Sequence, residues 1–133
     1  MYPIEFIFDG PPLSLQSKKG AKKTAYKNRV ALAAQAVLPN NFQPTTDDVV
    51  ITITYYYENI IGDVDNIIKP IQDSLNGIIY DDDNKVVDSR SRRKDINGSY
   101  KIKNASSVIL QGFANGRDFV HVKIELATEN QEL

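Results

Sequence analysis

Five aspartates of this chain fall into two groups that could do chemistry together. Asp63 and Asp65 stand two residues apart, and Asp81, Asp82 and Asp83 are consecutive. Carboxylates packed together repel, by roughly 4 kcal/mol for a pair 4 Å apart at an effective dielectric of 20, so such a cluster either spreads into solvent or binds a cation. Hard divalent ions such as Mg²⁺ and Mn²⁺ take carboxylate oxygens and water, and a bound ion can activate water and stabilise charge on a phosphoryl group.

One lysine has the spacing to join these aspartates. Lys69 follows Asp65 by four residues, so the two side chains share a face if this segment is helical. An ammonium group fixed beside metal-binding carboxylates suits a scissile phosphate or a leaving oxygen. The pattern therefore favours phosphodiester chemistry if the two acidic groups meet.

The same residues also have an ordinary structural interpretation. Asp63 and Asp65 could cap a helix, and Asp81 to Asp83 could form a solvated turn. Lys69 could simply pair with Asp65 and Asp73 at helical spacing. Convergence requires the chain after the helix to fold back along it, which the spacing allows but does not establish, so both interpretations stay open.

Net charge is −1, but the charges are segregated along the chain. Residues 1–46 carry a net +4, residues 47–88 a net −8 and residues 89–133 a net +3. Basic side chains that flank an acidic centre suit a nuclease, because cations hold a DNA backbone while carboxylates hold a metal. Taken alone, each basic stretch could equally be a solvated face. The residues expected to bind DNA are Lys18, Lys19, Lys22, Lys23, Arg90, Arg92, Arg93 and Lys94.

Hydrophobic periodicity predicts the elements that must position these groups. Alternating or β-branched runs predict strands over residues 2–8, 47–58, 85–93 and 119–127. Apolar residues three and four apart predict helices over residues 21–38 and 65–78, and residues 106–114 fit either a helix or a short strand. This order predicts an α+β fold, a small mixed β-sheet with two main helices packed on one face, in a single domain of residues 1–128 followed by a tail of residues 129–133.

Several function classes are excluded by what the chain lacks. It has no cysteine and only one histidine, so thiolate zinc sites and His-rich metal sites are excluded. It also has no Gly-rich phosphate loop and no Gly-x-Ser-x-Gly motif. His121 stands in an alternating pattern and is expected to be a strand residue. No apolar run is long enough to span a bilayer and the N-terminus lacks signal-peptide features, so we expect a soluble cytoplasmic protein with no membrane partner.

A longer motif gives these residues a family context. The stretch from Gly62 to Leu75 contains Asp-x-Asp-Asn, a lysine four residues after the second aspartate, and then Asp-x-Leu. It is followed by the pair Asp82-Asp83 before Val86-Val87, and an early Pro11-Pro12 follows the first predicted strand. This arrangement resembles the RusA family of Holliday junction resolvases, and the similarity covers most of residues 1–93.

The resemblance implies a small α+β homodimer that resolves four-way DNA junctions by symmetric paired nicking in recombination and repair. It implies dependence on Mg²⁺, with Mn²⁺ as an alternative ion. Asp63, Asp65 and Asp83 match the catalytic metal-binding aspartates, and Asp82 matches the additional residue beside the last one. Lys69 matches the catalytic lysine.

Other functions fit the sequence too. The chain could be a metal-dependent nuclease for other branched DNA, such as flaps. It could also be a non-catalytic DNA-binding module in which the aspartates serve as caps, or a protein-interaction domain.

Overall fold

The computed structural model describes residues 2–13, 20–58, 67–96 and 106–129. These residues form one four-stranded sheet with the strand order β1-β4-β2-β3. The strands are β1 (Ile4–Asp9), β2 (Val49–Tyr57), β3 (Val86–Asp95) and β4 (Phe119–Leu126). The helices are α1 (Gly20–Gln35), α2 (Ile68–Ser74) and α3 (Ser107–Ala114), with short 3₁₀ turns η1 (Asp83–Lys85) and η2 (Ala127–Glu129). The four predicted strands and the α+β class are confirmed.

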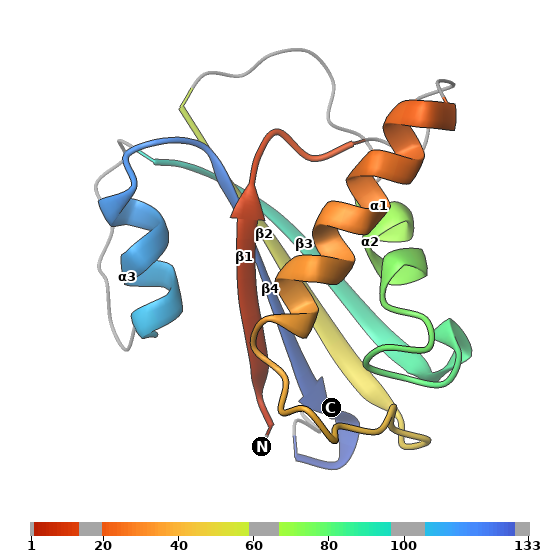
Figure 1. Ribbon diagram of the computed structural model, residues 1–133. Helices are drawn as coiled ribbons and strands as arrows, with labels where there is room; N and C mark the ends of the chain where they lie inside the picture. Colours follow the sequence, from red (N-terminus) through yellow and green to blue (C-terminus); the bar gives the residue numbers. More distant parts are fainter. Residues whose placement is uncertain (1, 14–19, 59–66, 97–105, 130–133) are drawn as a thin grey trace.

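The sheet is mixed because of one parallel pair. β4 lies antiparallel to both β1 and β2, whereas β2 and β3 are parallel neighbours. A parallel pair cannot be joined by a tight hairpin and needs a crossover connection. In this protein α2 lies on that crossover, between the end of β2 and the start of β3 (Figure 1).

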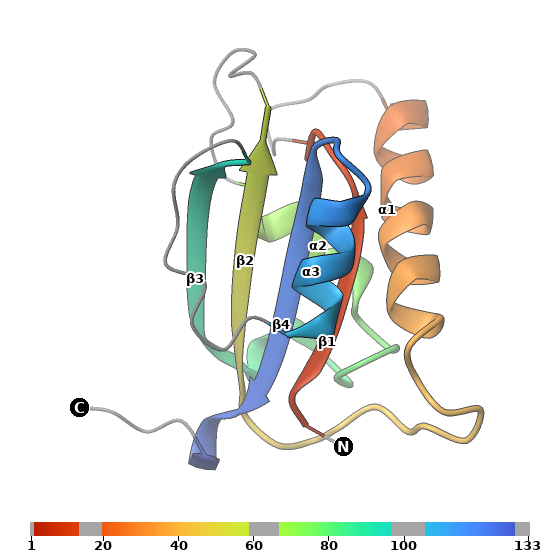
Figure 2. The ribbon, with the colours of Figure 1, turned by 90° about the vertical axis from the view of Figure 1, so that its left-hand side faces the viewer.

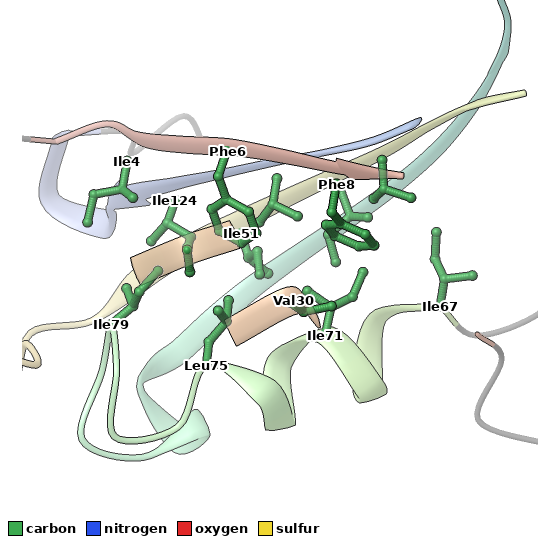
Figure 3. Packing of buried hydrophobic residues seen from close by; sticks show 14 of the residues in the cluster. Ile4, Phe6, Phe8, Val30, Ile51, Ile67, Ile71, Leu75, Ile79 and Ile124 are labelled. Atoms are coloured by element: carbon green, nitrogen blue, oxygen red, sulfur yellow. The ribbon is translucent and has the colours of Figure 1, made fainter. Parts of the chain in front are cut away.

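The core lies between the sheet and the two helices α1 and α2. The inward residues of β2 alternate as its sequence predicts, with Ile51 and Ile53 fully buried on the helix-covered face. They meet Val30 of α1 and Ile71 of α2, which are also fully buried (Figure 3). Burying one such side chain contributes about 1.5–3 kcal/mol, so this face fixes both helices on the sheet.

The third helix covers the opposite face of the sheet (Figure 2). The ambiguous segment 106–114 is helical from Ser107, because the Ser106 side chain caps it by accepting a hydrogen bond from the Ile109 N–H. Phe113 of this helix packs edge-on against Tyr56 and Phe119. A Cβ atom at Gly112 would lie 2.4 Å from the Phe119 ring, so the close approach of α3 to the sheet requires glycine there.

The second main helix is shorter than predicted. We expected residues 65–78; residues 65 and 66 lie outside the described residues, and the described helix ends at Ser74. The chain then turns at Gly77, whose φ of 75° suits glycine. The predicted apolar stripe ended on Ile78, but the turn buries Ile79 and leaves Ile78 half-buried.

The C-terminal end of the chain is described only as far as Glu129. The predicted tail 129–133 lies outside the described residues except for Glu129, which ends η2. Within the described part of the chain, no helix is both long and apolar enough to cross a bilayer.

His121 lies in β4, as predicted, and is almost completely buried. Its Nε2 lies 3.4 Å from Oε1 of Glu5 on β1, and the positive charges of Lys123 on β4 and Arg92 on β3 face it as well. Burial is the largest influence and lowers the pKa of His121, against the opposing effect of Glu5. The folded protein therefore holds this ring neutral.

This burial predicts a pH-dependent stability. Because the folded protein binds the His121 proton more weakly than the unfolded chain does, the free energy of unfolding should fall as pH drops below about 6.5, by at most about 1.4 kcal/mol per pH unit. Denaturant unfolding between pH 7.5 and 5.5 measures this slope. The His121→Gln variant should lose most of it, and an equal slope in both proteins would contradict the assignment.

Candidate active site

The site centres on Lys69, whose ammonium group lies between two carboxylates. Its Nζ is 2.8 Å from Oδ1 of Asp73 and 3.2 Å from Oδ2 of Asp83. The lysine side chain is 48% exposed and each aspartate side chain 27%, so the group is open to a ligand from solvent. Asp83 is fourteen residues from Lys69 in the sequence. The return of the chain towards the helix, which the spacing left open, is thus observed for Asp83.

Local structure explains why Asp83 reaches this position. The Asp82 side chain accepts a hydrogen bond from the Asn84 N–H at 3.3 Å and so caps η1, the 3₁₀ turn that begins at Asp83. β3 starts directly after this turn, at Val86. Because β3 pairs with β2 and α2 packs on the same sheet, the turn is brought beside the polar side of α2.

Two further hydrogen bonds hold α2 in place beside β3. The Gln72 Nε2 donates to Oγ of Ser89 on β3 at 2.6 Å. The Tyr80 hydroxyl donates to the Gln72 carbonyl oxygen at 2.7 Å, and Tyr80 itself is fully buried. Through Gln72, the helix that carries Lys69 is therefore hydrogen-bonded both to Ser89 of β3 and to the buried Tyr80.

The close charges shift the protonation equilibria of the site. The hydrogen bond from Lys69 is the main cause that lowers the pKa of Asp83. The hydrogen bond to Asp73, and then that to Asp83, raises the pKa of Lys69. Burial, followed by the negative charges of Asp83 and Asp73, raises the pKa of Tyr80. These shifts favour the charged forms of Asp83 and Lys69 and the neutral phenol of Tyr80 near neutral pH.

The other predicted acidic residues have different positions. Asp63 and Asp65 lie outside the described residues. Asp82 serves as the cap of η1, and Asp81 forms a separate ion pair with Lys85 at 2.8 Å. Across the described ranges, no group of three or more His, Cys, Asp or Glu side chains is arranged to hold a metal ion. The structure therefore describes one of the three principal predicted ligands, Asp83, together with the predicted lysine.

The two carboxylates that contact Lys69 carry oxygen donors of the kind that bind hard divalent cations. The oxygens of Asp73 and Asp83 are the ligand type that Mg²⁺ and Mn²⁺ prefer. A carboxylate has about four lone-pair sites on two oxygens, so Asp83 can accept from Lys69 through Oδ2 and still contribute to an ion. These two carboxylates have the right ligand chemistry but do not by themselves form a metal site among the described residues, and Asp83 is the one that the sequence also selects.

The predicted basic residues are distributed over several surfaces. Lys22 and Lys23 lie on α1, while Lys18 and Lys19 lie outside the described residues. The remaining four are all within β3, where side chains alternate between the two faces of the sheet. By register with β2, Arg93 lies opposite Tyr55, on the face that carries α2. Arg90, Arg92 and Lys94 lie opposite Thr52, Thr54 and Tyr56, on the other face.

Three residues of the site, Asp73, Gln72 and Ser89, have no role that the sequence alone predicts. Asp73 appeared only as a possible helical partner of Lys69, and its spacing of four residues was the signal that could have selected it. Gln72 and Ser89 carried no signal, because their contact depends on how α2 crosses β3.

The fold and this site define a small α+β domain in which a lysine lies between two carboxylates beside the start of the edge strand β3. The sequence model of the family described as endodeoxyribonuclease RusA matches residues 15–103, which is 89 of the 133 residues. The chain belongs to this family, and it is therefore a member of a family of DNA endonucleases. The match includes Lys69, Asp73 and Asp83. No curated protein matches the chain.

The Lys69–Asp83 ion pair leads us to expect a change in the pKa of Asp83 when the lysine is removed. Replacing Lys69 by Met should raise the pKa of the Asp83 carboxyl group, because the variant loses the hydrogen bond that favours the carboxylate. NMR titration of the carboxyl carbon measures this pKa. The matched control is Lys85→Met, which should raise the pKa of Asp81 and leave that of Asp83 unchanged. An unchanged Asp83 pKa in the Lys69→Met protein would contradict the described geometry.

Proposed function

We propose that this protein is a divalent-metal-dependent endodeoxyribonuclease that resolves four-way (Holliday) DNA junctions by symmetric paired nicking. The observation that carries the proposal is the Lys69–Asp83 contact, formed across fourteen residues inside the segment that matches the RusA family. Capping alone gives no reason for these two side chains to meet. An acidic oxygen donor beside a fixed ammonium group is what hydrolysis of a phosphodiester needs.

In the proposed site Asp63, Asp65 and Asp83 would hold Mg²⁺, or Mn²⁺ in its place, with Asp82 adjacent. When bound, the ion would supply a water of lowered pKa and positive charge for the phosphoryl oxygens. Hydrolysis forms a bond from the water oxygen to phosphorus and breaks the bond to the leaving sugar oxygen, which finally carries a proton. Lys69 would orient the scissile phosphate and stabilise the charge that develops on it.

The substrate is proposed to bind through its backbone. The proposed phosphate contacts come from Lys22 and Lys23 on α1 and from the basic side chains of β3, Arg90, Arg92, Arg93 and Lys94. Lys18 and Lys19, which lie outside the described residues, belong to the same proposal. Arg93 lies on the same face of the sheet as α2, which supports a proposed contact with the strand that is cut. Such contacts should make DNA binding depend strongly on salt concentration.

Paired cutting of a four-way junction also motivates a homodimer. A two-fold axis places two identical sites against two strands of like polarity, and one site alone would cut one strand. The dimer is part of the proposal, and sedimentation of the protein with and without a junction tests it.

The decisive variant is Asp83→Asn, which keeps the shape of the side chain and removes its negative charge. We expect Mg²⁺-dependent cleavage of a labelled four-way junction to fall at least about 100-fold, equivalent to about 2.7 kcal/mol of transition-state stabilisation. Junction binding in EDTA, measured by gel shift, should change little. Each strand is labelled separately, so that symmetric nicks in opposite strands are visible.

The matched control is Asp81→Asn, two residues away, whose partner is Lys85. It should cleave like the wild-type protein. Equal cleavage by the wild type and Asp83→Asn would reject the assignment. If the protein cuts a flap faster than a four-way junction, its substrate is another branched DNA. Salt-dependent DNA binding without any Mg²⁺-dependent product would favour a non-catalytic DNA-binding module.

A further inference from the structure

Three residues on the polar side of α2 form side-chain hydrogen bonds. Lys69, Gln72 and Asp73 are spaced three and four residues apart, so they lie along one side of the helix. Gln72 contacts Ser89 of β3, and Lys69 contacts Asp83 of η1. Asp73 contacts Lys69 through the shortest of the lysine's two contacts, at 2.8 Å.

We propose that Asp73 is a positioning residue that holds the Lys69 ammonium group beside Asp83. This inference rests on the proposed function, because it concerns the lysine of that site. A lysine side chain has four rotatable bonds and a 48% exposed lysine is free to sample many rotamers unless a partner restricts it. Two carboxylates that accept from one Nζ restrict it far more than one does.

The two carboxylates are not equivalent partners for the lysine. Asp83 is a proposed metal ligand, so its oxygens have a second task. Asp73 accepts from Lys69 through Oδ1 at a shorter distance and comes from the same helix. Asp73 can therefore keep the ammonium group in place while Asp83 serves the ion.

Asp73 itself stands on a rigid support, which a positioning residue requires. Its neighbours Ile71 and Ser74 are buried, and the Ser74 hydroxyl donates to the Pro70 carbonyl oxygen at 2.7 Å. The Gln72 backbone carbonyl is tied to buried Tyr80. The backbone on both sides of Asp73 is thus held by buried groups, and the Asp73 carboxylate extends from it to Lys69.

A different role for Asp73 makes a different prediction. If Asp73 were a metal ligand, its loss would raise the Mg²⁺ concentration needed for half-maximal cleavage. If it positions Lys69, its loss should lower kcat and leave that Mg²⁺ concentration and the KM for the junction within about two-fold. The two roles therefore separate in one set of kinetic measurements.

The test uses Asp73→Asn, with Asp73→Ser as a second variant and Asp81→Asn as the matched control. Asp81 also accepts from a lysine four residues later in an exposed ion pair, but that lysine is Lys85. In the protein without metal or DNA, ¹³C relaxation of the Lys69 side-chain methylenes reports its order. We expect this order to fall in both Asp73 variants and to stay unchanged in Asp81→Asn.

Cleavage gives the second readout. We expect kcat for the junction to fall about 10-fold or more in Asp73→Asn. A double-mutant cycle with Lys69→Met shows whether Asp73 acts through the lysine, because Asp73→Asn should then cost little further activity in the Lys69→Met background. Thermal unfolding of each variant, compared with Asp81→Asn, confirms that the fold is retained.

Several results would overturn the inference. Unchanged Lys69 order or wild-type kcat in the Asp73 variants would remove the positioning role. A raised Mg²⁺ requirement with Lys69 still ordered would make Asp73 a ligand instead, and additive losses in the cycle would show that it acts independently of Lys69. Absence of any DNA cleavage by the wild-type protein would reject the proposed function, while the relaxation measurement would still decide whether Asp73 orders Lys69.

Discussion

The parallel pairing of β2 and β3 is the constraint on which the site depends. Parallel neighbours need a crossover, and the buried residues Ile71 and Leu75 dock this crossover as α2 on the sheet. Because the apolar side of α2 packs on the sheet, the polar side of α2 faces η1 and β3. The turn that begins β3 carries Asp83, so the same hydrophobic contacts that stabilise the fold bring Asp83 to Lys69. Two side chains of the candidate site, fourteen residues apart in the sequence, are thereby brought into contact.

Lys69, Asp73 and Asp83 bring charges of both signs together at one place on the surface. Two carboxylates and one ammonium group leave a net negative charge, which favours a divalent cation. In the proposed function, the ammonium group supplies positive charge for a DNA phosphate. These side chains remain partly exposed, so the ion pairs themselves add little to stability. The ion pairs instead orient the Lys69 ammonium group, and buried side chains such as Tyr80 hold the backbone of α2 beneath it.

Much of this arrangement follows from sequence periodicity. The alternation in β2 identifies its buried face, and the spacing of Ile67, Ile71 and Leu75 identifies the buried side of α2. The motif containing Lys69 and Asp83 selects two residues of the site. The length of α2 could not be obtained in this way, because Ile78 and Ile79 continue an apolar pattern and only the turn at Gly77 decides which of them is buried. The basic run in β3 looked like one cluster, but strand alternation sends Arg93 and its neighbours to opposite faces. The Gln72–Ser89 contact depends on tertiary packing alone.

The proposed function requires Asp83 to be a metal ligand next to Lys69. Anomalous diffraction from crystals soaked in Mn²⁺ tests it most directly, because manganese can be located independently of activity. The account predicts an anomalous peak at coordination distance, about 2.1 Å, from an Asp83 carboxylate oxygen, with the Lys69 ammonium group nearby. Well-ordered Asp83 with no peak beside it at saturating Mn²⁺, or manganese bound only elsewhere, would contradict the claim.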